Sequence, residues 1–274
     1  MTDALLSPDP AVRAGWDSHV HVFEHDAPTV AGHYRPAERP LALIEAEADR
    51  HGVGHLVLVQ PSVYGSDNRV MLRALSTHPG RHRGVVVIDD TTPPQALWAM
   101  QAVGVRGARL NLVSPVGERG PLARRFEALA PRLSQLGWHL QWYLQPGHLA
   151  EVAALHAGSG VVCVLDHLAG MGANVPPGHP GWQALASLAR EGAWVKLSGW
   201  YRLGDSAPYP GLLEPVRRLA GLFGDRLVWG SDWPHTAFAD DALPPYASTW
   251  QPVQDALGAE AAHALLNRQP GLYA

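Results

Sequence analysis

The chain has 274 residues, close to the roughly 250 residues of a single eight-stranded α/β barrel. Its 46% hydrophobic and 17% charged content exclude a largely disordered chain. The formal net charge of −4 gives no electrostatic reason to expect nucleic-acid or anionic-membrane partners. A single cysteine, Cys163, excludes an internal disulfide framework and fits a reducing compartment. No apolar run reaches the roughly 20 residues of a membrane span, and the first residues show no leader pattern, so we expect a cytoplasmic protein.

Short β-branched segments alternate with longer segments of helical periodicity along the chain. The expected strands are 16–22, 54–60, 84–88, 106–111, 138–143, 161–165, 193–197 and 226–230. The expected helices are 40–51, 67–78, 94–103, 121–136, 147–157, 180–191, 211–223 and 246–266. This order predicts an α/β fold, a (β/α)8 TIM barrel forming a single domain over 1–274, with an N-terminal extension over about 1–13. The alternative, an open doubly wound sheet, should carry a glycine-rich phosphate loop after an early strand, and the sequence contains none.

A His-x-His pair ends the first expected strand, and chemistry in a barrel collects at the C-terminal ends of strands. His19 and His21 lie two residues apart, so the alternation of a strand places both on the same face. Both imidazoles can therefore point into the barrel mouth, as two metal ligands or two hydrogen-bond donors. The alternative is a pair of structural histidines.

A third histidine and two acids follow the sixth and eighth strands. Asp166 and His167 come directly after the apolar segment at 161–165, and Asp232 follows the segment at 226–230. Alone, an aspartate after a strand is often a helix cap. Together with the first-strand pair, these positions predict that Asp232, His19, His21 and His167 form a catalytic cluster.

Two further strand ends carry candidate substrate-binding side chains. Arg109 would point inward, where its planar guanidinium suits a substrate carboxylate, although a buried ion pair with a strand-end acid is the alternative. Tyr143 lies nearest the mouth on the fifth strand and could donate to a substrate oxygen. His139 lies deeper on the same face and is expected to be structural.

The remaining candidates lie in loops after the second and seventh strands. Ser62 is expected to contact substrate, whereas Asp67 is expected to cap the following helix. Arg202 is a second candidate ligand for a carboxylate, or else a solvated loop charge.

The chain resembles the amidohydrolase superfamily, in the branch of TIM-barrel lactonases that includes the 2-pyrone-4,6-dicarboxylate lactonases. The segments that carry the resemblance are WDSHVHVF, VQPSVYGSDN, GVRGARLN, LGWHLQWY, LDHLAG and WGSDWPH, in order along nearly the whole chain. The resemblance implies a hydrolase that opens the ester of a carboxylated lactone. Asp232 would activate water, the three histidines would polarise the carbonyl, and Arg109, Tyr143, Arg202 and Ser62 would bind substrate.

The use of a metal is open on this resemblance. Binuclear members of the superfamily carry a bridging Lys or Glu near the fourth strand, and here the only lysine, Lys196, lies on the seventh. A binuclear centre is therefore not expected. A single divalent ion such as zinc, held by His19, His21, Asp232 and His167, is the alternative to the metal-free chemistry that we favour.

The substrate is less well specified than the reaction. The pyrone-dicarboxylate enzymes carry another basic residue a few positions past the equivalent of Arg109, but here the chain continues through 112–115 without one and the next arginine is Arg119. Pyrone-dicarboxylate-like and sugar-acid lactones both remain open. The alternatives are a lactone isomerase, a metal-dependent decarboxylase, or a non-catalytic carboxylate-binding barrel. We expect a small-molecule carboxylate partner and a monomer or small homo-oligomer.

Overall fold

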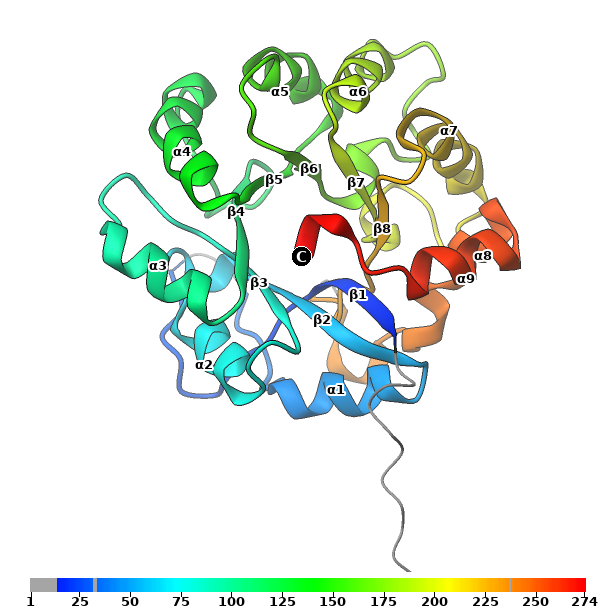
Figure 1. Ribbon diagram of the computed structural model, residues 1–274. Helices are drawn as coiled ribbons and strands as arrows, with labels where there is room; N and C mark the ends of the chain where they lie inside the picture. The colour runs from blue at the N-terminus through cyan, green and yellow to red at the C-terminus, as the bar shows by residue number, and fades with distance from the viewer. Residues whose placement is uncertain (1–13, 32–33, 237) are drawn as a thin grey trace, which may run out of the picture.

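The computed structural model describes residues 14–31, 34–236 and 238–274, so the expected extension over about 1–13 lies outside the described residues. Eight parallel strands run in chain order around a barrel, with helices between them on the outside (Figure 1). A single parallel bridge between Val20 and Trp233 joins the first strand to the segment after the eighth, which nearly closes the barrel. The predicted (β/α)8 architecture is confirmed.

The strands are β1 Gly15–Val20, β2 Val53–Val59, β3 Arg83–Val86, β4 Val105–Asn111, β5 His139–Tyr143, β6 Cys163–Leu165, β7 Trp194–Leu197 and β8 Leu227–Trp229. The helices are α1 Leu41–Asp49, α2 Arg69–Thr77, α3 Pro94–Ala102, α4 Leu122–Leu136, α5 Leu149–His156, α6 Gly181–Arg190, α7 Leu213–Phe223, α8 Gln251–Leu257 and α9 Ala259–Asn267. Each expected strand overlaps an observed one, because continuous apolar β-branched runs are typical of strands buried on both faces.

The last expected helix, 246–266, is wrong as a single element. Residues Tyr246–Thr249 form a 3-10 turn, and α8 and α9 are separated at Gly258, whose φ of 84° lies outside the helical region. Glycine adopts a positive φ without a steric penalty, so Gly258 can end α8. The helical periodicity of the side chains nevertheless continues into α9, which is why the sequence predicted one helix.

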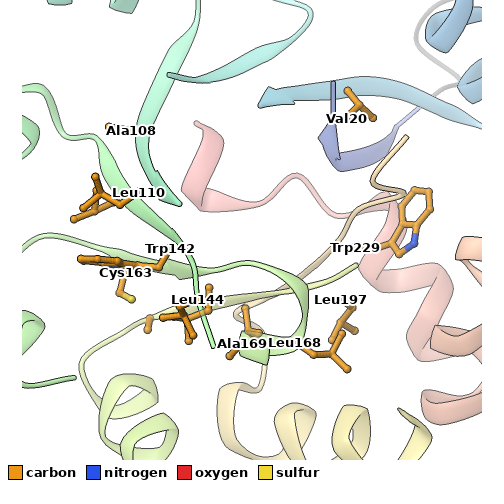
Figure 2. Close-up of a cluster of buried hydrophobic side chains, with 14 of the residues drawn as sticks. Val20, Ala108, Leu110, Trp142, Leu144, Cys163, Leu168, Ala169, Leu197 and Trp229 are labelled. Atoms are coloured by element: carbon orange, nitrogen blue, oxygen red, sulfur yellow. The ribbon is translucent and has the colours of Figure 1, made fainter. Parts of the chain in front are cut away.

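Apolar side chains form two layers, one on each side of the strands. The larger layer lies between strands and helices, and Figure 2 shows part of it, with Leu110, Trp142 and Cys163 on the neighbouring strands β4, β5 and β6. The smaller layer contains Trp16 and Tyr273, together with valines of β2, β3 and β8. Figure 1 shows the C-terminal segment inside the ring of strands, so Tyr273 closes this inner layer.

Among the helices of the described chain, none combines the length and apolar character needed to cross a membrane. Because every strand is parallel, all eight C-terminal ends open at one face of the barrel, and the loops that follow them surround a common mouth.

Candidate active site

A cavity of about 230 Å³ opens at this face. Seven of the eight residues expected from the sequence to form the site line it: His21, Ser62, Arg109, Tyr143, His167, Arg202 and Asp232. The eighth, His19, lies fully buried beside Asp232, with its Nε2 atom 3.7 Å from Asp232 Oδ1. The structure therefore brings the expected residues together, although they come from β1, β4 and β5 and from loops spread around the barrel.

The end of β1 is held by a buried carboxylate that sequence reasoning did not assign to the site. Asp17 Oδ1 accepts hydrogen bonds from the backbone N–H groups of His19 and Ser231, at 3.1 and 2.9 Å. Its Oδ2 accepts one from the Tyr246 hydroxyl at 2.8 Å. Burial raises the pKa of Asp17 to about 6, against the lowering effect of these hydrogen bonds. Asp17 thereby ties β1 to the segment after β8 and sets the spacing between His19 and Asp232.

The two oxygens of Asp232 have different surroundings. Oδ2 accepts hydrogen bonds from the Tyr201 hydroxyl at 2.7 Å and from Arg202 Nε–H at 2.9 Å. Oδ1 has no hydrogen-bond partner within the described residues and lies 3.7 Å from His19 Nε2 and 3.6 Å from His21 Nε2. Asp232 also has a φ of 61°, which is unusual for a residue other than glycine and is typical of backbone held in place at functional sites.

Electrostatics keep Asp232 ionised. Burial alone would raise its pKa, but the positive charge of Arg202 holds the pKa well below its usual range. Burial lowers the pKa of Arg202, and the charge of Asp232 more than offsets this, so the guanidinium is charged too. Arg202 is therefore the partner of the candidate base and not a solvated loop charge.

A second buried carboxylate, Asp166, organises the interior below the cavity. Its Oδ2 accepts hydrogen bonds from Arg109 Nε–H at 2.9 Å and from the Gln141 amide at 3.0 Å. Its Oδ1 lies 3.3 Å from His19 Nδ1 and 3.6 Å from Lys196 Nζ. Burial opposes its ionisation, yet the His19 ring that approaches it and the charges of Arg109 and Lys196 hold its pKa well below the usual range. The ion pair considered for Arg109 is thus present, and Arg109 also lines the cavity.

These contacts determine where the histidine protons lie. His21 Nδ1 is 2.7 Å from the carbonyl oxygen of Val59, which can only accept, so Nδ1 carries the proton. His19 Nδ1 faces the Asp166 carboxylate, and burial holds the pKa of His19 well below its usual value. In the neutral tautomers the Nε2 atoms of both rings are therefore acceptors, and both approach the unpartnered Oδ1 of Asp232. Three acceptors converge on a position that suits a cation or a water molecule that donates twice.

His167 completes this cluster from the loop after β6. Its Nδ1 lies 2.9 Å from the Ser198 hydroxyl, and burial lowers its pKa to about 4. His19, His167 and Asp232 each offer one ligand atom, all within 4.8 Å of one another. Imidazole nitrogens and a carboxylate oxygen are ligands that zinc accepts. The residues present therefore fit a single divalent ion, with His21 at the edge of the cluster.

Several residues that shape the site could not be identified from the sequence, because the residues around them form no recognisable functional pattern. Tyr201 and Lys196 lie on or after β7 among ordinary apolar residues, and nothing in their sequence neighbourhood shows that they approach Asp232 and Asp166. Asp17 and Asp166 were visible as acids beside the histidines, and that adjacency was the available signal. His139, expected to be structural, is buried below the site, where its ring meets that of Tyr273.

Comparisons with known proteins identify the class. A model of the amidohydrolase family matches residues 16–268, and the chain belongs to this family. It is 28% identical over 238 residues to a 4-sulfomuconolactone hydrolase of Rhizobium radiobacter, covering 85% of this chain and 80% of that protein. It is 29% identical over 238 residues to a 2-pyrone-4,6-dicarboxylate hydrolase of Comamonas testosteroni, covering 82% and 78% respectively.

Two further relatives bear on the fold and on the reaction. The crystal structure of a Pseudomonas putida protein, described as a candidate 2-pyrone-4,6-dicarboxylic acid hydrolase, superposes with a TM-score of 0.80 at 32% identity and covers 92% of this chain and 93% of its own. A D-galactarolactone isomerase of Agrobacterium fabrum is 25% identical over 251 residues, covering 87% of this chain and 83% of that protein. The relatives thus include lactone hydrolases and a lactone isomerase.

Proposed function

We propose that the protein is a lactonase that hydrolyses the ring ester of a carboxylated lactone, with Asp232 as the general base. The observation that carries this proposal is the unequal environment of the two Asp232 oxygens. Oδ2 is held by Tyr201 and Arg202, while Oδ1 is buried, unpartnered among the described residues and directed at two histidine nitrogens. An ionised oxygen in that position can take a proton from water as the water attacks an ester carbonyl.

The histidine tautomers refine the roles that we assign to each ring. His19 and His21 present Nε2 lone pairs beside Asp232 Oδ1, so they suit holding the attacking water rather than donating to the carbonyl. His167 is different, because the Ser198 hydroxyl can donate to its Nδ1 and leave the proton on Nε2. That proton would stabilise the oxyanion that develops on the carbonyl oxygen.

The rest of the cavity would orient the substrate. Arg109 lines the wall 5.3 Å from the centre of the Tyr143 ring, and the pair together offers a cation and a hydroxyl to a carboxylate. Ser62 lies in the turn after β2 and faces the same space. Arg202 would contact the substrate from the side on which it holds Asp232.

A divalent ion fits the cluster of His19, His167 and Asp232, with His21 beside it. When bound there it would lower the pKa of water and stabilise the developing negative charge. The positions of Tyr201, Arg202 and Asp166 serve the reaction in the same way with or without the ion, because they orient Asp232 and His19.

The test is a product analysis on a panel of carboxylated lactones, with metal content measured by elemental analysis in every sample. We expect ring opening to a hydroxy or keto acid, and a fall in kcat of about 1000-fold or more in Asp232→Asn, since general-base catalysis alone contributes up to about 10⁴-fold. Asp241→Asn makes the same chemical change at an exposed acid and serves as the control. Wild-type turnover by Asp232→Asn, with fold and metal content unchanged, would show that the assignment is wrong.

Lactone isomerisation is a second candidate, favoured by the similarity to the D-galactarolactone isomerase. Isomerisation moves the ester bond from one hydroxyl to another and leaves a lactone as product, whereas hydrolysis leaves an open acid. The same product analysis separates the two reactions, because hydrolysis in ¹⁸O-labelled water places the label in the product and isomerisation does not.

A further inference from the structure

The charged side chains of the cavity are already matched by buried partners. Among the described residues that line it, Arg109 and Arg202 carry the permanent positive charges. Arg202 is paired with Asp232 at 2.9 Å, so this pair adds no net charge. Arg109 is paired with Asp166, also at 2.9 Å, and Asp166 lies 3.6 Å from Lys196 as well.

The balance of these charges limits what the cavity can accept. Arg109, Lys196 and Asp166 together leave one positive charge, and including the ionised form of buried Asp17 leaves none. On either count, a substrate with two anionic groups would bring at least one negative charge that none of the described lining residues compensates. Burying an uncompensated charge is strongly unfavourable.

The other described residues of the lining are neutral. Hydroxyl and amide groups come from Tyr34, Ser62, Asn111, Ser114, Tyr143 and Thr236. Pro61, Val113 and Pro115 add apolar surface. Such a wall can hydrogen-bond hydroxyls and carbonyls and can pack against a ring, but it offers a second carboxylate no cation.

We propose that the site takes a lactone bearing a single carboxylate, seated on Arg109, with neutral polar groups elsewhere, and that it discriminates against a second anionic group. This inference rests on the proposed lactonase function and narrows its substrate class. It sets this chain apart from the relative that is named for a dicarboxylate.

The direct test compares substrates that differ by one charge. The probes are 2-pyrone-4,6-dicarboxylate and its two monoamides, in which a neutral carboxamide replaces either carboxylate without much change in ring reactivity. Each kcat/KM is divided by the rate constant for hydroxide hydrolysis of the same compound. We expect at least one monoamide to exceed the dicarboxylate by about 100-fold, the size of effect that an uncompensated charge of about 3 kcal/mol produces. A dicarboxylate that equals or exceeds both monoamides would overturn the inference.

A charge-insertion variant tests the same idea from the protein's side. Pro115 is exposed at the cavity rim in the loop after β4, so a long side chain there can reach inward without disturbing the core. We expect Pro115→Arg to raise kcat/KM for the dicarboxylate about tenfold, the value of one partly exposed charge-assisted contact. Pro115→Gln is the matched neutral variant and should give no such rise. An equal rise in both variants, or in neither, would contradict the charge argument.

A binding experiment separates this inference from the proposed reaction. Benzene-1,3-dicarboxylate and 3-carbamoylbenzoate are flat anions that cannot be hydrolysed at a ring ester, and calorimetry with the wild-type protein gives their Kd values. We expect the monoanion to bind at least about tenfold more tightly. If no lactone is turned over, the proposed function fails, while these Kd values still decide the charge preference. Equal or tighter binding of the dianion would refute it.

Discussion

The two carboxylate oxygens of Asp232 have different roles in the site: Oδ2 is held in place by neighbouring donors, and Oδ1 faces the histidines. The Tyr201 hydroxyl and Arg202 Nε–H both donate to Oδ2, which lowers the basicity of the carboxylate and fixes its plane. Oδ1 is left to face the histidines. These hydrogen bonds make Asp232 a weaker base but hold its carboxylate in one orientation. The orientation favours catalysis, because a misplaced base is a poor catalyst whatever its pKa.

Tyr201→Phe should therefore change the pH dependence of catalysis. Asp232 acts in its ionised form, so activity is present above its pKa and is lost as the pH falls through it. Removing a hydroxyl that donates to the anion raises the pKa of Asp232 and moves the acid limb of kcat/KM to higher pH. We also expect kcat to fall about tenfold or more, the value of one hydrogen bond to a charged group.

The measurement for this variant is the pH profile of kcat/KM from pH 9 down to the lowest pH at which both proteins stay folded, because the low pKa of Asp232 places the wild-type acid limb in the acid range. The matched control is Tyr209→Phe, because the Tyr209 ring lies beside that of Trp200 and its hydroxyl makes no hydrogen bond to Asp232 among the described residues. An acid limb at the same pH in Tyr201→Phe and in the wild type would show that the hydroxyl has no part in setting the pKa of Asp232.

Asp166 is the anion that neutralises two buried cations, Arg109 and Lys196. Removing its charge in Asp166→Asn leaves Arg109 and Lys196 without their common anion, in a place where burial already lowers the pKa of Lys196 to about 8. We expect the free energy of unfolding to fall by about 3–5 kcal/mol, as when one partner of a buried ion pair is removed.

Denaturant unfolding of three variants checks this expectation. Lys196→Met should cost less than Asp166→Asn, because Arg109 continues to neutralise Asp166. The double variant Asp166→Asn/Lys196→Met should recover part of the loss, since one unpaired cation is gone. A double variant that loses the sum of both single effects would argue against a shared charge network.

At the element scale, the site requires β1 and the end of β8 to approach closely. A Cβ atom at Gly230 would lie 2.5 Å from His19 Cβ and 2.9 Å from the His19 backbone nitrogen. Glycine is therefore required at this position by the contact between two elements, and not by a turn. The Asp17 hydrogen bonds to Ser231 and His19 hold the same two segments together.

Gly230→Ala should push β1 away from β8 and move His19 relative to Asp232. We expect kcat to fall by about 100-fold, because displacements of an ångström in a catalytic group cost that much. Gly221→Ala, in the exposed part of α7 with no atom within 4 Å of the added Cβ, should stabilise the protein by up to about 1 kcal/mol. Steady-state kinetics and thermal unfolding of both variants provide the comparison, and an active Gly230→Ala enzyme would show that the contact is not needed.

In the whole molecule, the C-terminal segment enters the ring of strands (Figure 1), and its hydrogen bonds to the starts of β3 and β4 place it at the end opposite the site. The Tyr273 ring is fully buried and stacks 5.9 Å from the centre of the Trp16 ring. The backbone oxygens of Tyr273 and Ala274 accept hydrogen bonds from the Nε–H groups of Arg83 and Arg106. The inner layer of the barrel is therefore completed by the last residues of the chain.

Tyr273→Ala should leave a cavity inside the barrel and lower the free energy of unfolding by about 3–5 kcal/mol. Tyr273→Phe keeps the ring and should stay within about 1 kcal/mol of the wild type, since the contact that matters is apolar stacking. Chemical denaturation measures both changes. A small loss in Tyr273→Ala would mean that the inner layer is stable without this ring.

The barrel could be predicted from the sequence, and so could most of the residues that the structure brings together at its mouth. Alternating runs of β-branched and helical character are local signals, and a parallel barrel turns their order directly into a ring with a common mouth. His19, His21, His167 and Asp232 could be placed there because each directly follows or ends an apolar strand.

The charge, orientation and pairing of those residues depend on contacts that form only in the folded chain. Tyr201 and Arg202 share Asp232 Oδ2, and Asp166 stands among His19, Arg109 and Lys196, through contacts between residues distant in the chain. Hydrogen-bond partners, proton positions and pKa shifts depend on distances and burial, which no local pattern encodes. The break at Gly258 has the same origin, because the backbone there follows the packing of α8 and α9 rather than the periodicity of their side chains.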